Sequence, residues 1–187
     1  MRVFLAIDIP NEVRRAIDEL IGKLQATCRG ARWARVEGMH LTLKFIGEAL
    51  PEKVERIKAE LKAIRLAAPV ELNFRNVGFF PTARSPRVFW AGVEATPNLA
   101  ELANEIEQRL EPLGIQRESR PFRPHLTLAR FRSLDGLAQL REALDSLAPF
   151  EFGSARTGEF HLYQSRLKPA GAEYTKLESF PFARNAS

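Results

Sequence analysis

The chain lacks several residues and patterns on which particular classes of protein depend. Cys28 is the one cysteine in 187 residues, so an internal disulfide and a cysteine-rich zinc site are both excluded. No stretch approaches about 18 consecutive apolar residues, and Met1–Pro10 lacks the long apolar region and cleavage site of a signal peptide. The glycine- and lysine-containing pattern of nucleoside-triphosphate-binding loops is also missing, so ATP is not implied. We therefore expect a soluble, cytoplasmic protein.

The composition is that of an ordinary globular protein with a basic balance of charge. The chain is 45% hydrophobic and 27% charged, its formal net charge is +5, and arginine outnumbers lysine 21 to 7. Guanidinium groups bind phosphate through paired hydrogen bonds, whereas lysine acts as a point charge. Loop-like stretches hold many of the arginines: Arg29, Arg32, Arg35, Arg84, Arg87, Arg117, Arg120 and Arg123. These arginines form either an ordinary solvated surface or a basic rim around a phosphate site.

A four-residue motif occurs twice. His40–Leu43 and His125–Leu128 are identical, 125 − 40 = 85 residues apart, and they contain two of the three histidines. The same offset carries Arg2–Ala6 onto Arg87–Ala91, which matches at four of five positions. Two segments that share one offset indicate an internal duplication of two large units, not the short period of a solenoid. We expect a single bilobal domain over 1–187, with duplicated units at about 1–80 and 87–165 and a C-terminal strand that closes the fold.

Each copy of the motif is expected to lie on a β-strand. Residues 41–46 are rich in apolar and β-branched side chains and stop at Gly47. Because strand side chains alternate between faces, one face should hold the polar residues of the first copy and the other its apolar residues. The polar face is expected to hold His40, Thr42 and Lys44, and the apolar face Leu41, Leu43 and Phe45. The second copy places His125 and Thr127 opposite its leucines, so the two His/Thr pairs of a pseudo-two-fold would face each other across one cleft.

Apolar periodicity predicts the remaining elements. Strands are expected at 2–9, 70–79, 87–94, 125–131, 156–165 and 173–180. Helices are expected from Asn11 to about Gln25, Pro51 to about Leu66, about Pro97 to Leu110 and about Leu134 to Leu147. Residues 27–39 are expected to form a loop, and the proline-flanked connector 81–86 to carry the chain between lobes. The fold class is then α+β: a bilobal, duplicated unit with a sheet in each lobe, helices outside and a central cleft. The direction of the strands is not readable from the pattern.

Three interpretations of the motif compete. A lone histidine on a strand is most often a half-buried structural residue, but a duplicated unit has no packing reason to retain the same polar pair twice. Two histidines could also bind a metal, although zinc needs three or four ligands and the neighbouring sequence supplies no others. The third interpretation is acid–base catalysis at a phosphodiester, in which one imidazole accepts a proton and the other donates one. Thr42 and Thr127 would then donate hydrogen bonds to the phosphate oxygens.

Five segments, spread over essentially the whole chain, carry a resemblance to a known family: Met1–Ile7, His40–Glu48, Arg87–Gly92, Pro124–Arg130 and Leu162–Leu167. With them the chain resembles the two-histidine phosphoesterases, specifically the RNA 2′,3′-cyclic phosphodiesterases formerly called 2′-5′ RNA ligases. The resemblance implies hydrolysis of a terminal 2′,3′-cyclic phosphate to a 2′-phosphate without metal or other cofactor. It also implies that His40 protonates the departing 3′ oxygen, that His125 accepts a proton from water, and that Arg130 helps to hold phosphate. Reversible 2′-5′ RNA ligation would be a further activity.

The expected partner is RNA with a 2′,3′-cyclic phosphate end, such as tRNA fragments, or small cyclic nucleotides, and the expected state is a monomer. The alternative is a non-catalytic RNA-binding module of the same fold. Strict alternation from His125 places Arg130 on the wrong face, so a bulge or a strand end is needed there. His161 has no threonine two residues later and is expected to be structural. Aromatic residues that would either stack on bases or pack in the protein are Trp33, Phe80, Phe122 and Tyr163.

Overall fold

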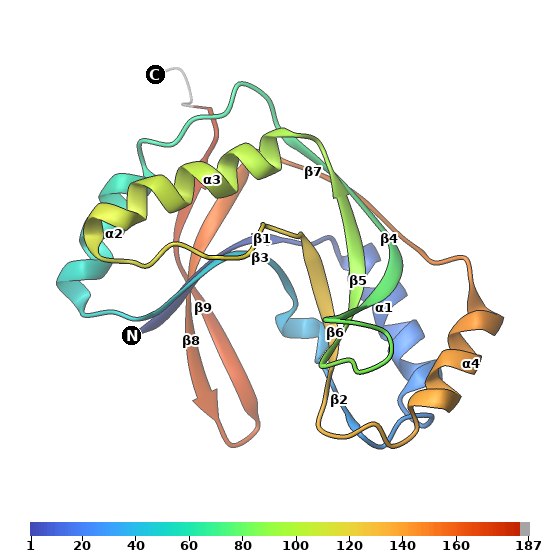
Figure 1. Cartoon of the computed structure of the whole chain (residues 1–187). Coiled ribbons are helices and arrows are strands. Elements are labelled where there is room, and N and C mark those ends of the chain that lie inside the picture. The colour runs from blue at the N-terminus through green and yellow to red at the C-terminus, as the bar shows by residue number, and fades with distance from the viewer. Residues whose placement is uncertain (184–187) are drawn as a thin grey trace.

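The computed structural model describes residues 1–183, which form two antiparallel β-sheets and four α-helices (Figure 1). The first sheet has the strand order β3-β1-β8-β9, with β3 at His40–Glu48, β1 at Arg2–Asp8, β8 at Glu159–Lys168 and β9 at Gly171–Pro181. The second sheet has the order β2-β6-β5-β4-β7, with β2 at Ala31–Trp33, β6 at His125–Phe131, β5 at Val88–Ala95, β4 at Val70–Phe80 and β7 at Glu151–Thr157. The predicted mixed fold with two sheets is confirmed.

The helices lie on the outer sides of the sheets. They are α1 at Asn11–Leu24, α2 at Pro51–Leu61, α3 at Asn98–Leu110 and α4 at Leu137–Leu147, and short 3-10 turns occupy Val36–Gly38 (η1) and Glu111–Leu113 (η2). Figure 1 shows α2 and α3 beside the first sheet and α1 and α4 beside the second. The apolar positions of α1 are buried as their helical spacing predicts, each worth about 1.5–3 kcal/mol of transfer free energy; they are Val13, Ile17, Leu20, Ile21 and Leu24. None of the helices in residues 1–183 is long and apolar enough to cross a lipid bilayer.

The strands of the two halves are exchanged between the sheets. Strand β4, which ends the first half, pairs with β5 and β7 in the second sheet, and β8, from the second half, pairs with β1 in the first. The expectation that 81–86 crosses between lobes is wrong, because this connector joins β4 and β5, antiparallel neighbours in one sheet. The chain instead passes between the sheets at the connections β1–β2, β2–β3, β3–β4 and β7–β8. The last of these passages consists of Gly158 alone.

The sequence pattern did not predict β2 and β7 as separate strands. The predicted loop at 27–39 contains β2, which pairs with the last residues of β6. The predicted strand at 156–165 covers the end of β7 and most of β8, which belong to different sheets. Both elements are pinned by pairing with distant strands, which local periodicity does not reveal.

Both motif strands contain a β-bulge at the same position. In the first sheet Ala6 pairs with Thr42 and Leu5 with Lys44, so Leu43 has no partner. In the second sheet Trp90 pairs with Thr127 and Phe89 with Ala129, so Leu128 is the extra residue. A bulge of one residue reverses which face the following side chains occupy. The bulges therefore decide which residues join the histidines.

The bulge overturns the expected faces of Lys44 and Phe45. Lys44 is 7% exposed and its ammonium donates to Glu107 of α3, on the side of the sheet away from His40. Phe45 is 67% exposed, and its ring lies 6.0 Å from the ring of Phe4, which in turn lies 5.8 Å from His40. Phe45, not Lys44, shares the face of His40.

The first strands of the two halves match with a different offset from the motif strands. Thr42 and Thr127 are 127 − 42 = 85 residues apart, but their partners Ala6 and Trp90 are 90 − 6 = 84 apart. The similarity of Arg2–Ala6 to Arg87–Ala91 is thus one residue out of structural register. Because a one-residue slip exchanges faces, Phe4 lies beside His40 whereas Phe89 is fully buried in the core.

Candidate active site

The two motif strands lie where the sheets meet. Strands β3 and β6 contact each other although they belong to different sheets. Figure 1 shows both near the centre of the molecule. Each motif begins at the first residue of its strand, so His40 and His125 both stand at a strand end. The structure therefore brings the two motifs to one region.

His40 is oriented by the short turn that precedes it. The guanidinium of Arg14 on α1 donates to the backbone carbonyls of Val36 at 2.9 Å and Glu37 at 2.7 Å, which ties η1 to the helix. The backbone carbonyl of Gly38, the last residue of η1, favours the protonated form of the His40 ring. Arg14 thus holds the turn from which the strand of His40 begins.

Aromatic rings surround the half-buried His40. Its ring centroid lies 4.4 Å from Tyr163, 5.3 Å from Tyr174 and 5.8 Å from Phe4. Burial lowers the pKa of His40, while the nearby carboxylate of Asp8 acts in the opposite direction. Without substrate the ring is therefore neutral at pH 7, and a bound phosphate anion would favour its protonated form.

His125 is held by an equivalent backbone contact. Its Nδ1 lies 2.7 Å from the carbonyl oxygen of Arg123, two residues earlier, as Gly38 is two residues before His40. Because a carbonyl only accepts hydrogen bonds, Nδ1 carries the proton and Nε2 is left for chemistry. The edge of the ring meets Phe80, with centroids 5.1 Å apart. His125 thus presents Nε2 from an anchored ring.

The wall beside His125 is formed by a tryptophan that packs flat against a glycine. The rings of Trp90 and Phe80 lie 5.2 Å apart. A Cβ on Gly78, which pairs with Trp90, would come within 2.2 Å of the indole, so only glycine leaves room for the ring. The indole Nε1 of Trp90 is buried and has no hydrogen-bond partner among residues 1–183.

The bulge at Leu128 places Arg130 on the side of the sheet that carries His125 and Thr127. The burial pattern of β6 places these three side chains toward solvent and Leu126, Leu128 and Ala129 in the core. The bulge that the sequence analysis required for Arg130 to reach this face is therefore present. Arg130 pairs directly with Arg32 of β2, and both are exposed. Two guanidinium groups thus stand side by side on the motif face.

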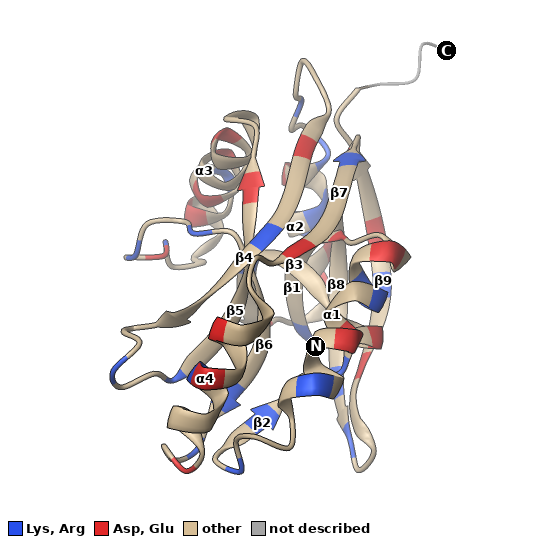
Figure 2. Cartoon of the chain, turned by 90° about the vertical axis from the view of Figure 1, so that its right-hand side faces the viewer, with Lys and Arg blue, Asp and Glu red and all other residues tan. Residues whose placement is uncertain are grey.

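The other arginines expected at a basic rim do not all gather there. Figure 2 shows basic positions on β2 and on the loops at the same end of the second sheet. Arg35 donates instead to the carbonyl of Ala170 at the tip of the β8–β9 hairpin. Arg117 is directed to Glu111 and Asn104, each at 3.4 Å. The rim is therefore narrower than the sequence indicated.

The expected aromatic platforms divide into two groups. Phe80 and Tyr163 lie against the motif histidines, whereas Trp33 packs on Phe89 and Phe122 packs against the core. Phe45 is the platform that sequence reasoning missed, because alternation assigned it to the core. It occupies the position in the first motif strand that Arg130 occupies in the second, and that correspondence at the 85-residue offset was the available signal.

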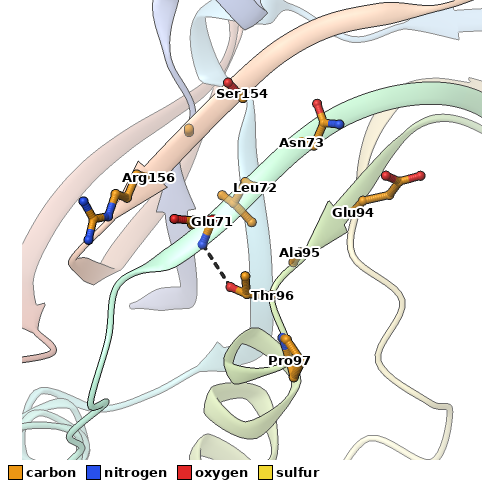
Figure 3. A pocket seen from close by; sticks show the side chains of 10 residues that line it. Glu71, Leu72, Asn73, Glu94, Ala95, Thr96, Pro97, Ser154 and Arg156 are labelled. Carbon is orange, nitrogen blue, oxygen red and sulfur yellow. Dashed lines mark hydrogen bonds between the residues drawn. The ribbon is translucent and has the colours of Figure 1, made fainter.

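One hollow of the surface is lined by neither motif. It is open, has a volume of about 700 Å³, and lies over β4, β5, β7 and the start of α3 (Figure 3). Its walls carry Glu71, Glu94 and Arg156, and the backbone N–H of Glu71 donates to Thr96 Oγ1 at 3.0 Å. It contains no histidine, and its two carboxylates are poorly suited to a phosphate.

The side chains that commonly bind metals are dispersed. Within residues 1–183, no group of three or more His, Cys, Asp or Glu side chains is arranged to hold a metal ion. His161 is 3% exposed, with its Nδ1 2.9 Å from Ser179 Oγ, so it is packed within the first sheet.

Comparison with known proteins gives consistent matches. The model of the 2′-5′ RNA ligase superfamily matches residues 10–168. The chain is 36% identical over 184 residues to the RNA 2′,3′-cyclic phosphodiesterase of Thermotoga maritima, covering 97% of this chain and 96% of that protein. It is 32% identical over 180 residues to the protein of the same name from Archaeoglobus fulgidus, covering 96% and 99%.

Solved structures agree with the sequence matches. A structure of E. coli LigT complexed with 3′-AMP has a TM-score of 0.79 at 30% identity and covers 98% of both chains. The structure of TT0787 from Thermus thermophilus has a TM-score of 0.78 at 32% identity, covering 97% of this chain and 98% of that one.

Proposed function

The chain belongs to the 2′-5′ RNA ligase superfamily, and from this premise we propose that it hydrolyses RNA 2′,3′-cyclic phosphate ends to 2′-phosphates by acid–base catalysis with two histidines. One observation carries the proposal: identical His/Thr pairs stand at the starts of two contacting strands, each followed by a bulge at the same position. Neither core packing nor a single-histidine site accounts for that repetition.

The chemistry requires one base and one acid. His125 Nε2 accepts a proton from water as the water oxygen bonds to phosphorus. The bond between phosphorus and the 3′ oxygen breaks, and His40 Nε2–H donates its proton to that oxygen. The product is a 2′-phosphate with a free 3′ hydroxyl, and proton exchange with solvent restores both rings. Thr42, Thr127 and Arg130 would stabilise the charge on the phosphate oxygens.

The substrate class is supported by what surrounds the histidines. Arg130 and Arg32 offer two guanidinium groups for phosphates. Phe45 offers an exposed ring, close to His40 through Phe4, on which a base can stack. An E. coli LigT structure contains 3′-AMP, which supports a nucleotide site in this fold. RNA ends such as those of tRNA fragments, or small cyclic nucleotides, suit this combination.

The test is incubation of the purified protein with an oligoribonucleotide that ends in a 2′,3′-cyclic phosphate, with and without EDTA. We expect a 2′-phosphate end, identified by its resistance to a 3′-specific phosphatase activity, at equal rates in both samples. Product lost only with EDTA would contradict the metal-independent mechanism. Binding of the RNA without any product would mean that the protein is a non-catalytic RNA-binding module.

A further inference from the structure

The two motif histidines have different partners on the neighbouring strand. His40 pairs with Asp8, whereas His125 pairs with Gly92. A Cβ on Gly92 would lie 2.5 Å from the backbone oxygen of Arg75, so the second half has no room for a side chain at this position. A carboxylate thus stands beside the first histidine alone.

The aromatic neighbours of the histidines differ in the same sense. Tyr163 and Phe80 occupy matched positions, since Tyr163 pairs with Phe4 of β1 and Phe80 with Val88 of β5. Each ring contacts its motif histidine. Only the tyrosine has a hydroxyl, and that hydroxyl donates to Asp8 Oδ1. The first site therefore has both Asp8 and the tyrosine hydroxyl that binds it. The second site has neither.

The carboxylate of Asp8 is fixed from three sides. Besides the bond from Tyr163, Lys176 Nζ donates to Oδ2 at 2.8 Å, and His161 Nε2 lies 3.4 Å from the same oxygen. Burial raises the pKa of Asp8, but the hydrogen bonds from Lys176 and Tyr163 outweigh it and the net shift is downward. The group is therefore a fixed negative charge at neutral pH. The fixed charge lies on the strand next to the one that carries His40.

We infer that Asp8, held by Tyr163 and Lys176, is a positioning residue that stabilises the protonated form of His40 and so makes His40, not His125, the proton donor. The inference rests on the proposed function, because it assigns the cause of unequal roles within the two-histidine mechanism. It requires no further group: Asp8 neither loses nor gains a proton and acts on His40 through its charge.

The charges that face His40 come from three elements. Asp8 on β1 favours the protonated ring, while Arg14 on α1 and Lys176 on β9 disfavour it, as burial does. Without the charge of Asp8, burial and the two cations would dominate, and all of them disfavour the protonated ring. His40 would then lose its proton at a lower pH.

The test is the pH dependence of single-turnover hydrolysis in the wild type and in Asp8→Asn, which keeps the size of the side chain. The wild type should show a bell, since the base must be neutral and the acid protonated. In Asp8→Asn we expect the alkaline limb to move to lower pH and the acidic limb to stay in place. An unmoved alkaline limb, or a shift of the acidic limb in its stead, would overturn the inference while the proposed function stood.

Two further variants separate charge from structural damage. Tyr163→Phe reproduces the Phe80 arrangement of the other half and should move the alkaline limb in the same direction by less. Lys176→Met removes a cation near His40 while Tyr163 still holds Asp8, and should move the limb to higher pH. A shift of the Tyr163→Phe limb to higher pH would show that the charge of Asp8 is not the cause.

A measurement without substrate makes the result independent of activity. The chain has three histidines, so NMR titration of their imidazole protons, assigned by single substitutions, gives the pKa of His40 directly. That pKa should fall in Asp8→Asn. A wild type with no hydrolytic activity at any pH would contradict the proposed function; an unchanged His40 pKa would contradict the role of Asp8.

Discussion

At the scale of single residues, His40 is subject to opposed influences. The aromatic rings and the burial of the side chain favour its neutral form, while the neighbouring Asp8 and a bound phosphate favour the charged form that a proton donor needs. His125 lies beside Gly92 and Phe80, which carry no charge. The two imidazoles are thus chemically alike but differ in their electrostatic surroundings.

Replacement of either motif histidine should abolish most of the activity. We expect His40→Ala and His125→Ala each to lower single-turnover hydrolysis by roughly 10²–10⁴-fold, the usual contribution of one positioned acid or base. Thr42→Ala and Thr127→Ala should cost less, because other donors remain. Asn73→Ala, in the hollow of Figure 3, is the matched control and should hydrolyse at the wild-type rate. Near-normal activity in a folded histidine variant would disprove the role of that residue.

At the scale of elements, the bulges determine what the motif strands present. Sequence alternation correctly placed Thr42 with His40 and Thr127 with His125, because these residues precede the bulge. It failed for Phe45, which lies beyond the bulge. A bulge is specified by the pairing partner as much as by its own residue. The sequence of one strand therefore predicts the histidine and threonine but not the residue three positions later.

The middle of the first motif strand is joined to α3 of the other half by a buried ion pair. Lys44 Nζ lies 2.7 Å from Glu107 Oε2, with side-chain exposures of 6% and 16%, and it also donates to the carbonyl of Gln116 at 2.7 Å. Glu107 accepts in turn from the backbone N–H of Glu118 at 3.2 Å. The ion pair thus fixes the start of the loop that leads to His125.

Breaking this ion pair should destabilise the protein strongly. We expect Glu107→Ala to lower the free energy of unfolding by about 3–5 kcal/mol, since it leaves a buried ammonium unpaired. Chemical denaturation measures this, and Lys44→Met combined with Glu107→Leu should recover much of the loss. Glu55→Ala removes the partner of Lys58, 70% exposed at the carboxylate, and serves as a control that should change stability by less than about 1 kcal/mol. Equal effects of Glu107→Ala and Glu55→Ala would show that burial of the pair has no consequence.

At the scale of the whole molecule, the duplication in sequence is not a division into independent halves. The first half retains only β1 and β3 in the first sheet, because β8 and β9 come from the other end of the chain. The local patterns predicted helices and most strands at nearly their observed bounds, since burial on one face leaves a periodic trace. The exchange of β4 and β8 was not predictable, because their partners lie in distant segments and either sheet would bury the same apolar face.

Neither half should therefore fold by itself. A fragment of residues 1–84 contains two adjacent strands of one sheet and two separated strands of the other, and isolated two-stranded pairs are marginally stable in water. We expect circular dichroism and NMR of 1–84 and of 85–187 to show no cooperative unfolding, and a mixture of the two to regain structure. Cooperative thermal unfolding of either fragment alone would contradict this expectation.

The four passages of the chain between the sheets have a mechanical consequence. If a single linker joined the two sheets, they could rotate relative to each other. Thermal motion would then vary the distance between the two histidines, which lie on different sheets. Here four covalent connections, one of them Gly158 alone, and the contact between β3 and β6 restrict the movement of one sheet relative to the other. The distance between the two imidazoles is accordingly set when the protein folds, and it does not depend on substrate binding. Turnover should then persist on warming until a sheet itself melts.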